Sequence, residues 1–241
     1  KELIRSYKKY NTTIFVSNTA KIAFNKTFPE INTKKDVIYN TVDFDKIISR
    51  SKESITDLEI DIHKINLVSV GRYTHQKGYT RLILIVKELF NQGMDVHLYL
   101  VGSGELESDY RQLIADQNLA KHVTLVGFKD NPYKYVKNFD LFVCSSYSEG
   151  FSTAVTEALL VGTPVITTLC SGMEELLGYN NEYGIITDNN DKALFEGIKM
   201  LIENPDSLRK YRERASKRGN LLCRNNNTIK VENLLDDLMG F

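Results

Sequence analysis

Several residue types are scarce in this chain of 241 residues, and each scarcity excludes a class of protein. The chain has no tryptophan, four prolines and three cysteines, which stand far apart at Cys144, Cys170 and Cys223. An odd number of separated cysteines, without a Cys-x-x-Cys pair, argues against a disulfide framework or a zinc site and favours a reducing compartment. The longest apolar runs, such as LILIV at 82–86, fall far short of the roughly 20 residues that span a bilayer.

An excess of charge of either sign is also missing. The 31 Lys and Arg residues balance the 31 Asp and Glu residues, so the formal net charge is zero. Nucleic-acid-binding proteins usually carry a strong basic excess, and we therefore expect no nucleic-acid partner. Hydrophobic residues make up 42% and charged residues 26%, which excludes a disordered chain and is ordinary for a folded domain with a substantial core.

The chain begins at Lys1 rather than at a methionine, inside the charged stretch KELIRSYKKY, and we expect it to be part of a longer protein. The basic residues of this stretch have two interpretations. They are either a patch that contacts anionic lipid or, as is more common, a solvated helix face. The residues concerned are Lys1, Arg5, Lys8 and Lys9.

Short runs rich in Val, Ile, Leu and Phe alternate with segments of helical period. Weak alternation of polarity within the runs suits strands that are covered on both faces. Helical segments between them predict parallel strands with right-handed crossovers, and hence an α/β fold with a Rossmann-like, doubly wound parallel sheet. The expected strands are 65–71, 96–102, 123–128, 140–146, 164–169 and 183–188, with helices at 79–92, 105–118 and 153–161 between them and a helical C-terminal tail at 191–203, 206–218 and 227–239.

The first 64 residues differ in pattern from the rest. Residues 12–18 read as a strand, 19–28 as a short helix and 37–40 as another short strand. Residues 41–64 are polar and loop-like, and this break in composition is our candidate for a linker or a domain boundary.

A loop with two cations follows the first strand of the predicted sheet. It reads Gly71-Arg72-Tyr73-Thr74-His75-Gln76-Lys77-Gly78, and ligands of an open parallel sheet bind at such strand ends. The glycines allow tight turns, while Arg72 and Lys77 suit a phosphate group. From these residues alone, a solvated loop with two unrelated charges is an equally good interpretation.

Two glutamates flank a helix start later in the chain, in the stretch 148–159. Glu149 precedes the helix and Glu157 lies within it, with seven residues between them. Ser152 is a natural N-cap, and the free N–H groups at 152–154 would bind an anion with help from the helix dipole. Glu149 as a simple cap and Glu157 as a solvated residue are the alternatives. The apolar neighbours of Glu157 argue against solvation, because a buried carboxylate needs a partner such as a ligand hydroxyl.

Other sequence motifs for catalysis, metal binding or nucleotide binding are absent or weak. Gly102-Ser103-Gly104 follows a strand but has no third glycine in place, so it is not the dinucleotide fingerprint. His63, His97 and His122 lack metal-ligand spacing, whereas His75 lies in the two-cation loop. Neither a Gly-x-Ser-x-Gly elbow nor a phosphate-binding Walker motif appears, which argues against hydrolases and P-loop enzymes.

The ordered combination of these segments resembles the nucleotide-sugar-binding half of GT-B glycosyltransferases. More narrowly it is similar to the retaining family 4 (group 1), whose signature is Glu-x7-Glu, and EGFSTAVTEALLVGTPVITT followed by CSGMEELLG is similar to enzymes of bacterial capsule and surface-polysaccharide assembly. The resemblance covers residues 12–240. It is carried by Gly71-Arg72…Lys77-Gly78, Val101-Gly102-Ser103-Gly104, Val126-Gly127-Phe128, Glu149-Gly150-Phe151…Glu157-Ala158 and Gly162-Thr163-Pro164-Val165-Ile166.

The resemblance implies a domain organisation and an activity. Residues 1–41 would be a remnant of an N-terminal acceptor domain with the crossover, 42–64 a linker, and 65–241 the C-terminal donor-binding domain. The enzyme would transfer the sugar of a nucleotide diphosphate sugar, with UDP-sugar as our first choice, to a glycan or lipid-linked acceptor with retention of configuration. It would be cytoplasmic, with peripheral contact at the inner membrane face as an option, and the isolated chain would be inactive without the acceptor domain.

The resemblance also implies roles for individual residues. Arg72 and Lys77 would hold the departing diphosphate and form the catalytic group together with Glu149, which would lie beside the donor sugar. Glu157 would bind the ribose hydroxyls. No metal cofactor is expected, because the cations and the helix dipole would take the place of Mg²⁺. The complete donor-binding set is Gly71, Arg72, Lys77, Phe128 and Asp130 near the base and phosphates, Glu149, Gly150, Phe151, Ser152 and Thr153 around the sugar and phosphates, and Glu157.

Two departures from the family pattern leave the sugar open. Cys170-Ser171-Gly172 stands where many members have a pair of glycines, and Ser152-Thr153 stands where many have Gly-Leu. Two other functions remain as alternatives at this stage. One is a sugar-nucleotide epimerase of the same architecture, and the other is a nucleotide-sugar-binding module without chemistry.

Overall fold

A six-stranded parallel sheet forms the centre of the main domain in the computed structural model, which describes residues 2–224 and 227–239. The strand order is β5-β4-β3-β6-β7-β8. From β3 the chain adds β4 and β5 towards one edge, and it then crosses to the other side of β3 and adds β6, β7 and β8. This is the doubly wound Rossmann order, and the predicted fold class is confirmed. The strands are β3 (Ile65–Val70), β4 (Val96–Val101), β5 (Val123–Gly127), β6 (Leu141–Cys144), β7 (Val165–Thr168) and β8 (Ile185–Thr187).

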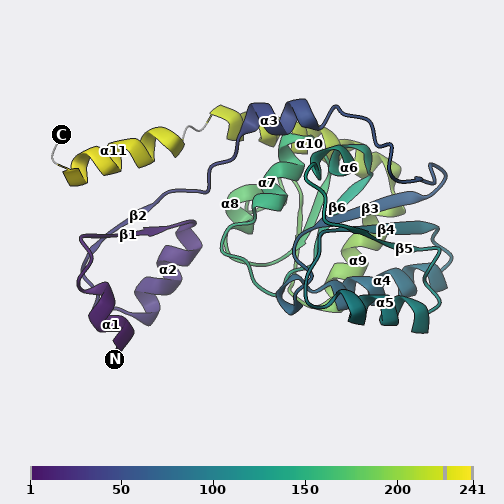
Figure 1. The fold of residues 1–241 in the computed structure, drawn as a ribbon, viewed down its shortest axis with the longest axis horizontal. Helices are drawn as coiled ribbons and strands as arrows, with labels where there is room; N and C mark the ends of the chain where they lie inside the picture. The colour runs from purple at the N-terminus through teal and green to yellow at the C-terminus, as the bar shows by residue number, and fades with distance from the viewer. Residues whose placement is uncertain (1, 225–226, 240–241) are drawn as a thin grey trace.

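Helices cover both faces of this sheet, as Figure 1 shows. Alternate residues of a strand point to opposite faces, so Leu67 and Val68 of β3 belong to two different core clusters. The cluster around Leu67 packs under α4 (Tyr79–Asn91), α5 (Glu107–Asp116) and α9 (Asp191–Ile202). The cluster around Val68 packs under α6 (Tyr133–Asn138), α7 (Thr153–Leu160), α8 (Met173–Leu177) and α10 (Pro205–Arg224). All six predicted strands are present, with ends that differ from the prediction by at most two residues.

A second, smaller body precedes the main domain, and we call residues 2–37 the N-terminal unit. It contains α1 (Glu2–Tyr7), β1 (Thr12–Phe15), α2 (Asn18–Thr27) and β2 (Lys34–Val37), with β1 and β2 parallel. The prediction placed the second strand at 37–40, three residues too late, and offered a helix at the chain start only as one of two interpretations of its basic residues. The C-terminal helix α11 (Asn227–Met239) returns to this unit and forms a shallow pocket with residues of β2.

The segment 41–64 contains a helix that we did not expect. Asp43 caps α3 (Phe44–Arg50) by accepting a hydrogen bond from the Lys46 N–H at 3.0 Å. Ile47 is 2% exposed, because α3 packs against α6 and α7. The interpretation of this whole segment as a loop was therefore wrong over 44–50. Its polar composition concealed one short apolar face whose partners are distant in the sequence.

Polar contacts join the N-terminal unit to the main domain. The Glu175 carboxylate of α8 accepts hydrogen bonds from the backbone N–H groups of Asn18 and Thr19, both at 3.0 Å, and from the Tyr39 hydroxyl at 2.7 Å. Burial opposes ionisation of Glu175, but these hydrogen bonds outweigh it and lower its pKa. A carboxylate from one body thus satisfies the first free N–H groups of a helix in the other.

Candidate functional site

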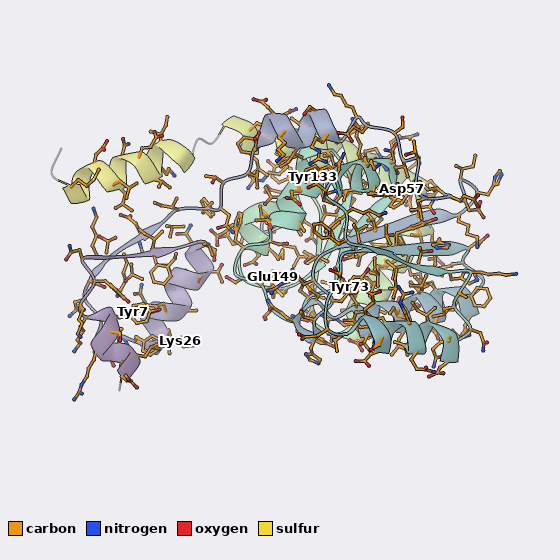
Figure 2. All side chains as sticks on the ribbon, viewed as in Figure 1. Tyr7, Lys26, Asp57, Tyr73, Tyr133 and Glu149 are labelled. Atoms are coloured by element: carbon orange, nitrogen blue, oxygen red, sulfur yellow. The ribbon has the colours of Figure 1, made fainter. Side chains whose placement is uncertain are left out.

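The candidate site lies where the strand order reverses. β3 and β6 are neighbours in the sheet, yet their following loops lead to α4 and α7 on opposite faces. The diverging loops open a crevice at the carboxyl ends of the strands, which is the usual binding position in this fold. The β3 loop carries Arg72 and Lys77, and the β6 loop carries Glu149. Glu149 lies on the side of the main domain that faces the N-terminal unit (Figure 2).

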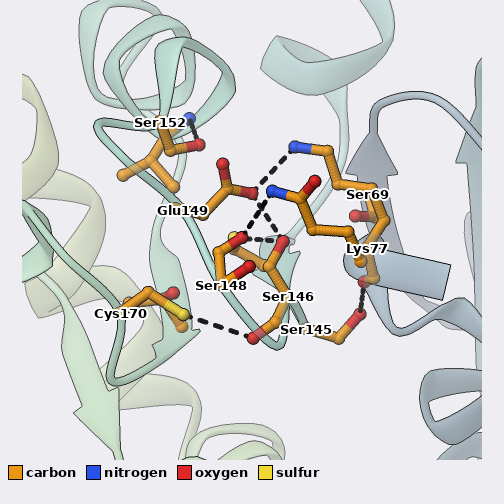
Figure 3. Close-up of polar contacts among 12 residues, drawn as sticks. Ser69, Lys77, Ser145, Ser146, Ser148, Glu149, Ser152 and Cys170 are labelled. Atoms are coloured by element: carbon orange, nitrogen blue, oxygen red, sulfur yellow. Dashed lines mark hydrogen bonds and ion pairs between the residues drawn. The ribbon is translucent and has the colours of Figure 1, made fainter. Parts of the chain in front are cut away.

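Lys77 and Glu149 form an ion pair across this crevice. The Lys77 Nζ lies 2.8 Å from Glu149 Oε1, and the Ser146 hydroxyl donates to the same oxygen at 2.6 Å. The other carboxylate oxygen points away from both partners, as Figure 3 shows. The side chains are 22% exposed for Lys77 and 9% for Glu149, so the pair is shielded without being sealed from solvent. Two residues that the sequence places on separate loops thus meet in one polar cluster.

Glycines in the loops after β3 and β4 allow the backbones of neighbouring loops to approach closely. Gly78 has a φ of 66°, and a Cβ added there would lie 2.2 Å from the Ser145 carbonyl oxygen. Gly102 has a φ of 148°, and a Cβ there would lie 2.0 Å from the Gly71 oxygen. Any other residue at either position would push the loops apart, because such separations are far inside van der Waals contact.

The start of α7 borders the same crevice. Ser152 is buried and its hydroxyl accepts a hydrogen bond from the Val155 N–H at 3.3 Å, which confirms the predicted N-cap. Thr153 is exposed, and Phe151 is half-buried against Tyr39 with ring centroids 5.1 Å apart. Gly150 is exposed on the side where Val16 of the N-terminal unit approaches. The backbone of this helix start therefore lies close to both bodies.

Glu157 occupies a different environment one and a half turns further along α7. Burial raises its pKa to about 7. Within residues 2–224 and 227–239 its side chain has no hydrogen bond or ion pair to the protein. Its charge is sensed by Tyr133 on α6, whose pKa is raised chiefly by burial and then by Glu157. A desolvated carboxyl without a protein partner is a candidate for binding a ligand hydroxyl.

The far end of the crevice is an open pocket between the loops after β3, β4 and β5. Arg72 and Phe128 line it, and Phe128 is 75% exposed. Asp130 stands at its edge, where Arg50 of α3 binds its carboxylate at 2.7 Å and lowers its pKa. The structure thus groups Arg72 with Phe128 and groups Lys77 with Glu149. The pocket is lined by Val70, Gly71, Arg72, Val101, Gly102, Ser103, Phe128, Lys129 and Pro132.

Sequence reasoning missed two serines of the β6 loop. The Ser146 hydroxyl binds Glu149, and the Ser145 hydroxyl donates to the Lys77 carbonyl at 2.9 Å. Cys170 adds a contact from its thiol to the Ser146 carbonyl at 3.3 Å, and burial raises the pKa of this thiol. The signal available in the sequence was the Ser-Ser pair directly after a buried strand.

Two general features of the described residues complete the picture. No group of three or more His, Cys, Asp or Glu side chains in 2–224 and 227–239 is arranged to hold a metal ion. No helix in the same ranges is long and apolar enough to cross a membrane. Of the basic residues at the chain start, Arg5, Lys8 and Lys9 are exposed, while Lys1 lies outside the described residues.

Comparison with known proteins identifies the family of this chain. Residues 51–218 match the family model described as glycosyl transferases group 1, and the chain therefore belongs to that family. It is 32% identical to an uncharacterized glycosyltransferase of Methanocaldococcus jannaschii, over 88% of this chain and 61% of that protein. It is 33% identical to N-acetylgalactosamine-N,N'-diacetylbacillosaminyl-diphospho-undecaprenol 4-alpha-N-acetylgalactosaminyltransferase of Campylobacter jejuni, over 78% of this chain and 50% of that protein. The chain thus spans about half to three-fifths of these curated relatives.

Solved structures show the same fold. Sucrose-phosphate synthase from Thermosynechococcus elongatus superposes with a TM-score of 0.84 at 21% identity, over 99% of this chain and 61% of that one. HepE from Anabaena, crystallised in complex with UDP, superposes with a TM-score of 0.77 at 22% identity, over 99% of this chain and 66% of that one. The sheet, the flanking helices and the N-terminal unit all match the GT-B architecture.

Proposed function

We propose that this chain is the donor-binding part of a retaining glycosyltransferase of family 4 that uses a UDP-sugar. The observation that carries the proposal is the Lys77–Glu149 pair at the point where the strand order reverses. The pair sets a cation beside a hydrogen-bond acceptor. A sugar diphosphate presents the matching groups, because its phosphate oxygens lie beside sugar hydroxyls. The bound donor would take over both partners, with phosphate on Lys77 and sugar on Glu149.

Charge stabilisation is the chemistry that these residues would supply. When the bond between sugar and diphosphate breaks, negative charge grows on the phosphate oxygens. Lys77, Arg72 and the free N–H groups at the start of α7 would stabilise that charge, since preorganised donors need little rearrangement. We propose that this set acts without a metal cofactor. The new glycosidic bond would form on the face that the diphosphate leaves, and the configuration would be retained.

The nucleoside would occupy the other half of the crevice. Glu157 would bind the ribose hydroxyls, and with a pKa of about 7 its carboxyl can accept a hydrogen bond when ionised and donate one when protonated. The base would lie against the exposed ring of Phe128, near the backbone before Asp130. Gly71 permits the nucleotide to approach the end of β3 closely.

Relatives support the class of donor and suggest the acceptor. HepE was solved with UDP and with UDP-glucose, and the Campylobacter relative acts on a diphospho-undecaprenol-linked sugar. A Staphylococcus aureus relative with 36% identity is a capsular polysaccharide biosynthesis glycosyltransferase. We therefore propose a glycan or lipid-linked acceptor of surface-polysaccharide type, handled in the cytoplasm at the inner membrane face.

Calorimetric titration of the 241-residue chain with UDP, a panel of UDP-sugars and uridine tests the donor proposal. We expect UDP and one UDP-sugar to bind, and uridine to bind much more weakly because it lacks the diphosphate. A folded chain that binds none of them at millimolar concentration contradicts the proposal. A sugar-transfer assay on the full-length protein, with product anomers resolved by NMR, then tests retention and separates an enzyme from a binding module.

A further inference from the structure

A buried arginine on α4 lies behind the candidate site. Arg81 is in the first turn of α4 and is only 2% exposed, although it carries a charge. Buried arginines need nearly all of their five N–H donors satisfied, and the partners of those donors indicate what the residue holds in place. Its partners here are backbone atoms of the β6 loop and two side chains that follow β8, Asn189 and, at 3.7 Å, the Asp191 carboxylate.

The guanidinium of Arg81 binds the carbonyl groups of two consecutive serines. Its Nε donates to the Ser145 oxygen at 2.7 Å, and its Nη2 donates to the same oxygen and to the Ser146 oxygen, the latter at 2.8 Å. Both Nη atoms also donate to Asn189 Oδ1 at 3.0 Å. The Tyr147 ring covers the guanidinium at 4.0 Å. One side chain therefore holds three successive residues of the loop.

The same two serines reach both members of the ion pair. The Ser145 hydroxyl donates to the Lys77 carbonyl and the Ser146 hydroxyl donates to the Glu149 carboxylate, as Figure 3 shows. Arg81 is thus linked to Lys77 through Ser145 and to Glu149 through Ser146. Because the two charged residues are on different loops, a group that fixes both serines at once helps to set their separation, together with the hydrogen bond from the Tyr147 N–H to the Gln76 oxygen at 2.8 Å.

Asn189 also fixes the β6 loop, through contacts with the residues that follow β6 and β7. Its Nδ2 donates to the Tyr147 carbonyl at 2.9 Å and to the Leu169 carbonyl at 3.2 Å. The ends of β6 and β7 are therefore tied to the residue that follows β8, while Arg81 ties the end of β6 to α4. A lysine at position 81 would retain the charge but could not reach these acceptors with one planar fork.

We propose that Arg81, with Asn189, is a positioning residue that sets the separation of Lys77 and Glu149 for the donor diphosphate. This inference rests on the proposed function of that pair. It predicts a defect specific to the diphosphate, because the contacts of Arg81 lead to Lys77 and Glu149 and do not reach the pocket that Phe128 lines.

Arg81→Lys tests the proposal, with Arg111→Lys on α5 as the matched control, since Arg111 is exposed and binds only Glu107. We expect Arg81→Lys to weaken UDP binding roughly tenfold, a coupling typical of contacting residues, and to leave uridine binding unchanged. In the Lys77→Ala background, Arg81→Lys should weaken UDP binding by less than twofold. If Arg81 had a purely structural role, Arg81→Lys would weaken UDP binding by the same factor with and without Lys77→Ala. It would also weaken uridine binding as much as UDP binding. Either result overturns the proposal.

Hydrogen exchange separates this inference from the proposed function, because it needs no ligand. Arg81→Lys should speed amide exchange in residues 74–78 and 145–149, whereas Arg111→Lys should not. If the parent chain binds no UDP while both loops still loosen, the donor proposal fails and with it the role for the diphosphate, whereas the positioning of the two loops by Arg81 stands. If exchange stays unchanged in both loops, the positioning role fails. Should Arg81→Lys not fold, Asn189→Ala is the second variant, with the same expected results.

Discussion

The N-terminal unit and the main domain differ in how much side chain they bury. In the main domain two apolar clusters fill the space on either side of the sheet, with Leu67 and Val68 fully buried. In the N-terminal unit, by contrast, only Ser17 and Ile31 of residues 2–37 are buried, and Ile22 remains 67% exposed. The main domain is therefore stabilised by its own core, while the N-terminal unit depends more on polar contacts such as those of Glu175.

Truncation of the core should give the largest difference between the two regions. Leu98→Ala in β4 removes a fully buried side chain and should lower the free energy of unfolding by about 2–5 kcal/mol. Ile22→Ala in α2 removes an exposed one and should change it by less than about 0.5 kcal/mol. Urea unfolding followed by circular dichroism measures both. Similar losses for the two variants would contradict the contrast drawn above.

Replacement of a lysine by alanine should weaken UDP binding in the main domain but not in the N-terminal unit. Lys77→Ala should weaken UDP binding by roughly ten- to a hundredfold, since hydrogen bonds to charged groups have this size. Uridine binding should not change, because it has no phosphate. Lys8→Ala in the N-terminal unit is the control, and it should leave both affinities as they are. Equal losses of UDP and uridine affinity in Lys77→Ala would refute the diphosphate role of Lys77.

Burial of a carboxyl group makes the stability of the main domain depend on pH. The pKa of Glu157 is raised from its ordinary 4.5 to about 7, so the unfolded chain releases this proton at lower pH than the folded one. Stability from this group is thus lost as pH rises from about 4.5 to 7. Glu157→Gln should stabilise the chain by about 1–3 kcal/mol at pH 8 and by almost nothing at pH 4.

The control for this prediction comes from the other region. Glu30 of the N-terminal unit is exposed, and Glu30→Gln should give the same small change in unfolding free energy at both pH values. A gain for Glu157→Gln that is equal at pH 4 and pH 8 would show that the pKa of Glu157 is the same in the folded and the unfolded chain, and would remove burial as the cause.

Disruption of the junction between the regions should have the smallest effect. Glu175→Gln keeps the shape of the side chain but removes its charge, and should weaken the cap on α2 by about 1 kcal/mol or less. Hydrogen exchange at the Asn18 and Thr19 amides should speed accordingly, and the pKa of Tyr39 should fall from about 12. Glu174→Gln, one residue earlier in the same helix, is the control. Unchanged exchange at both amides in Glu175→Gln would show that this contact does not hold the two bodies together.

Short-range patterns were sufficient for the six strands of the main sheet, but not for every element of the first 64 residues. The six strands, the Ser152 cap and the burial of Glu157 follow from apolar runs, spacing and neighbours that lie close in the chain. The helix α3 was missed because Ile47 gains its stability from α6 and α7, which are some 90 to 110 residues away. The second strand of the N-terminal unit was misplaced because its register is set by β1 rather than by its own residues.

The candidate site also has one part that local sequence patterns predicted and another that depends on the order of the strands. The sequence placed Lys77 and Glu149 after two strands, since the residue types and their position after apolar runs are local properties. That the two side chains bind each other depends on β3 and β6 being neighbours, an order that local patterns do not contain. The roles of Arg81, Ser145, Ser146 and Glu175 depend on the same order, because each acts on residues of another strand end.

The amino-acid sequence by itself therefore determined the family and the class of fold, and it pointed to Lys77, Glu149 and Glu157 as candidate site residues. Those properties reside in residue identity and in periodicity along the chain. Only the tertiary structure decided which charges meet, which carboxyl group is left without a protein partner and which arginine stands behind the site. Such properties arise when the sheet brings distant strand ends together and packing removes water from some of them but not from others.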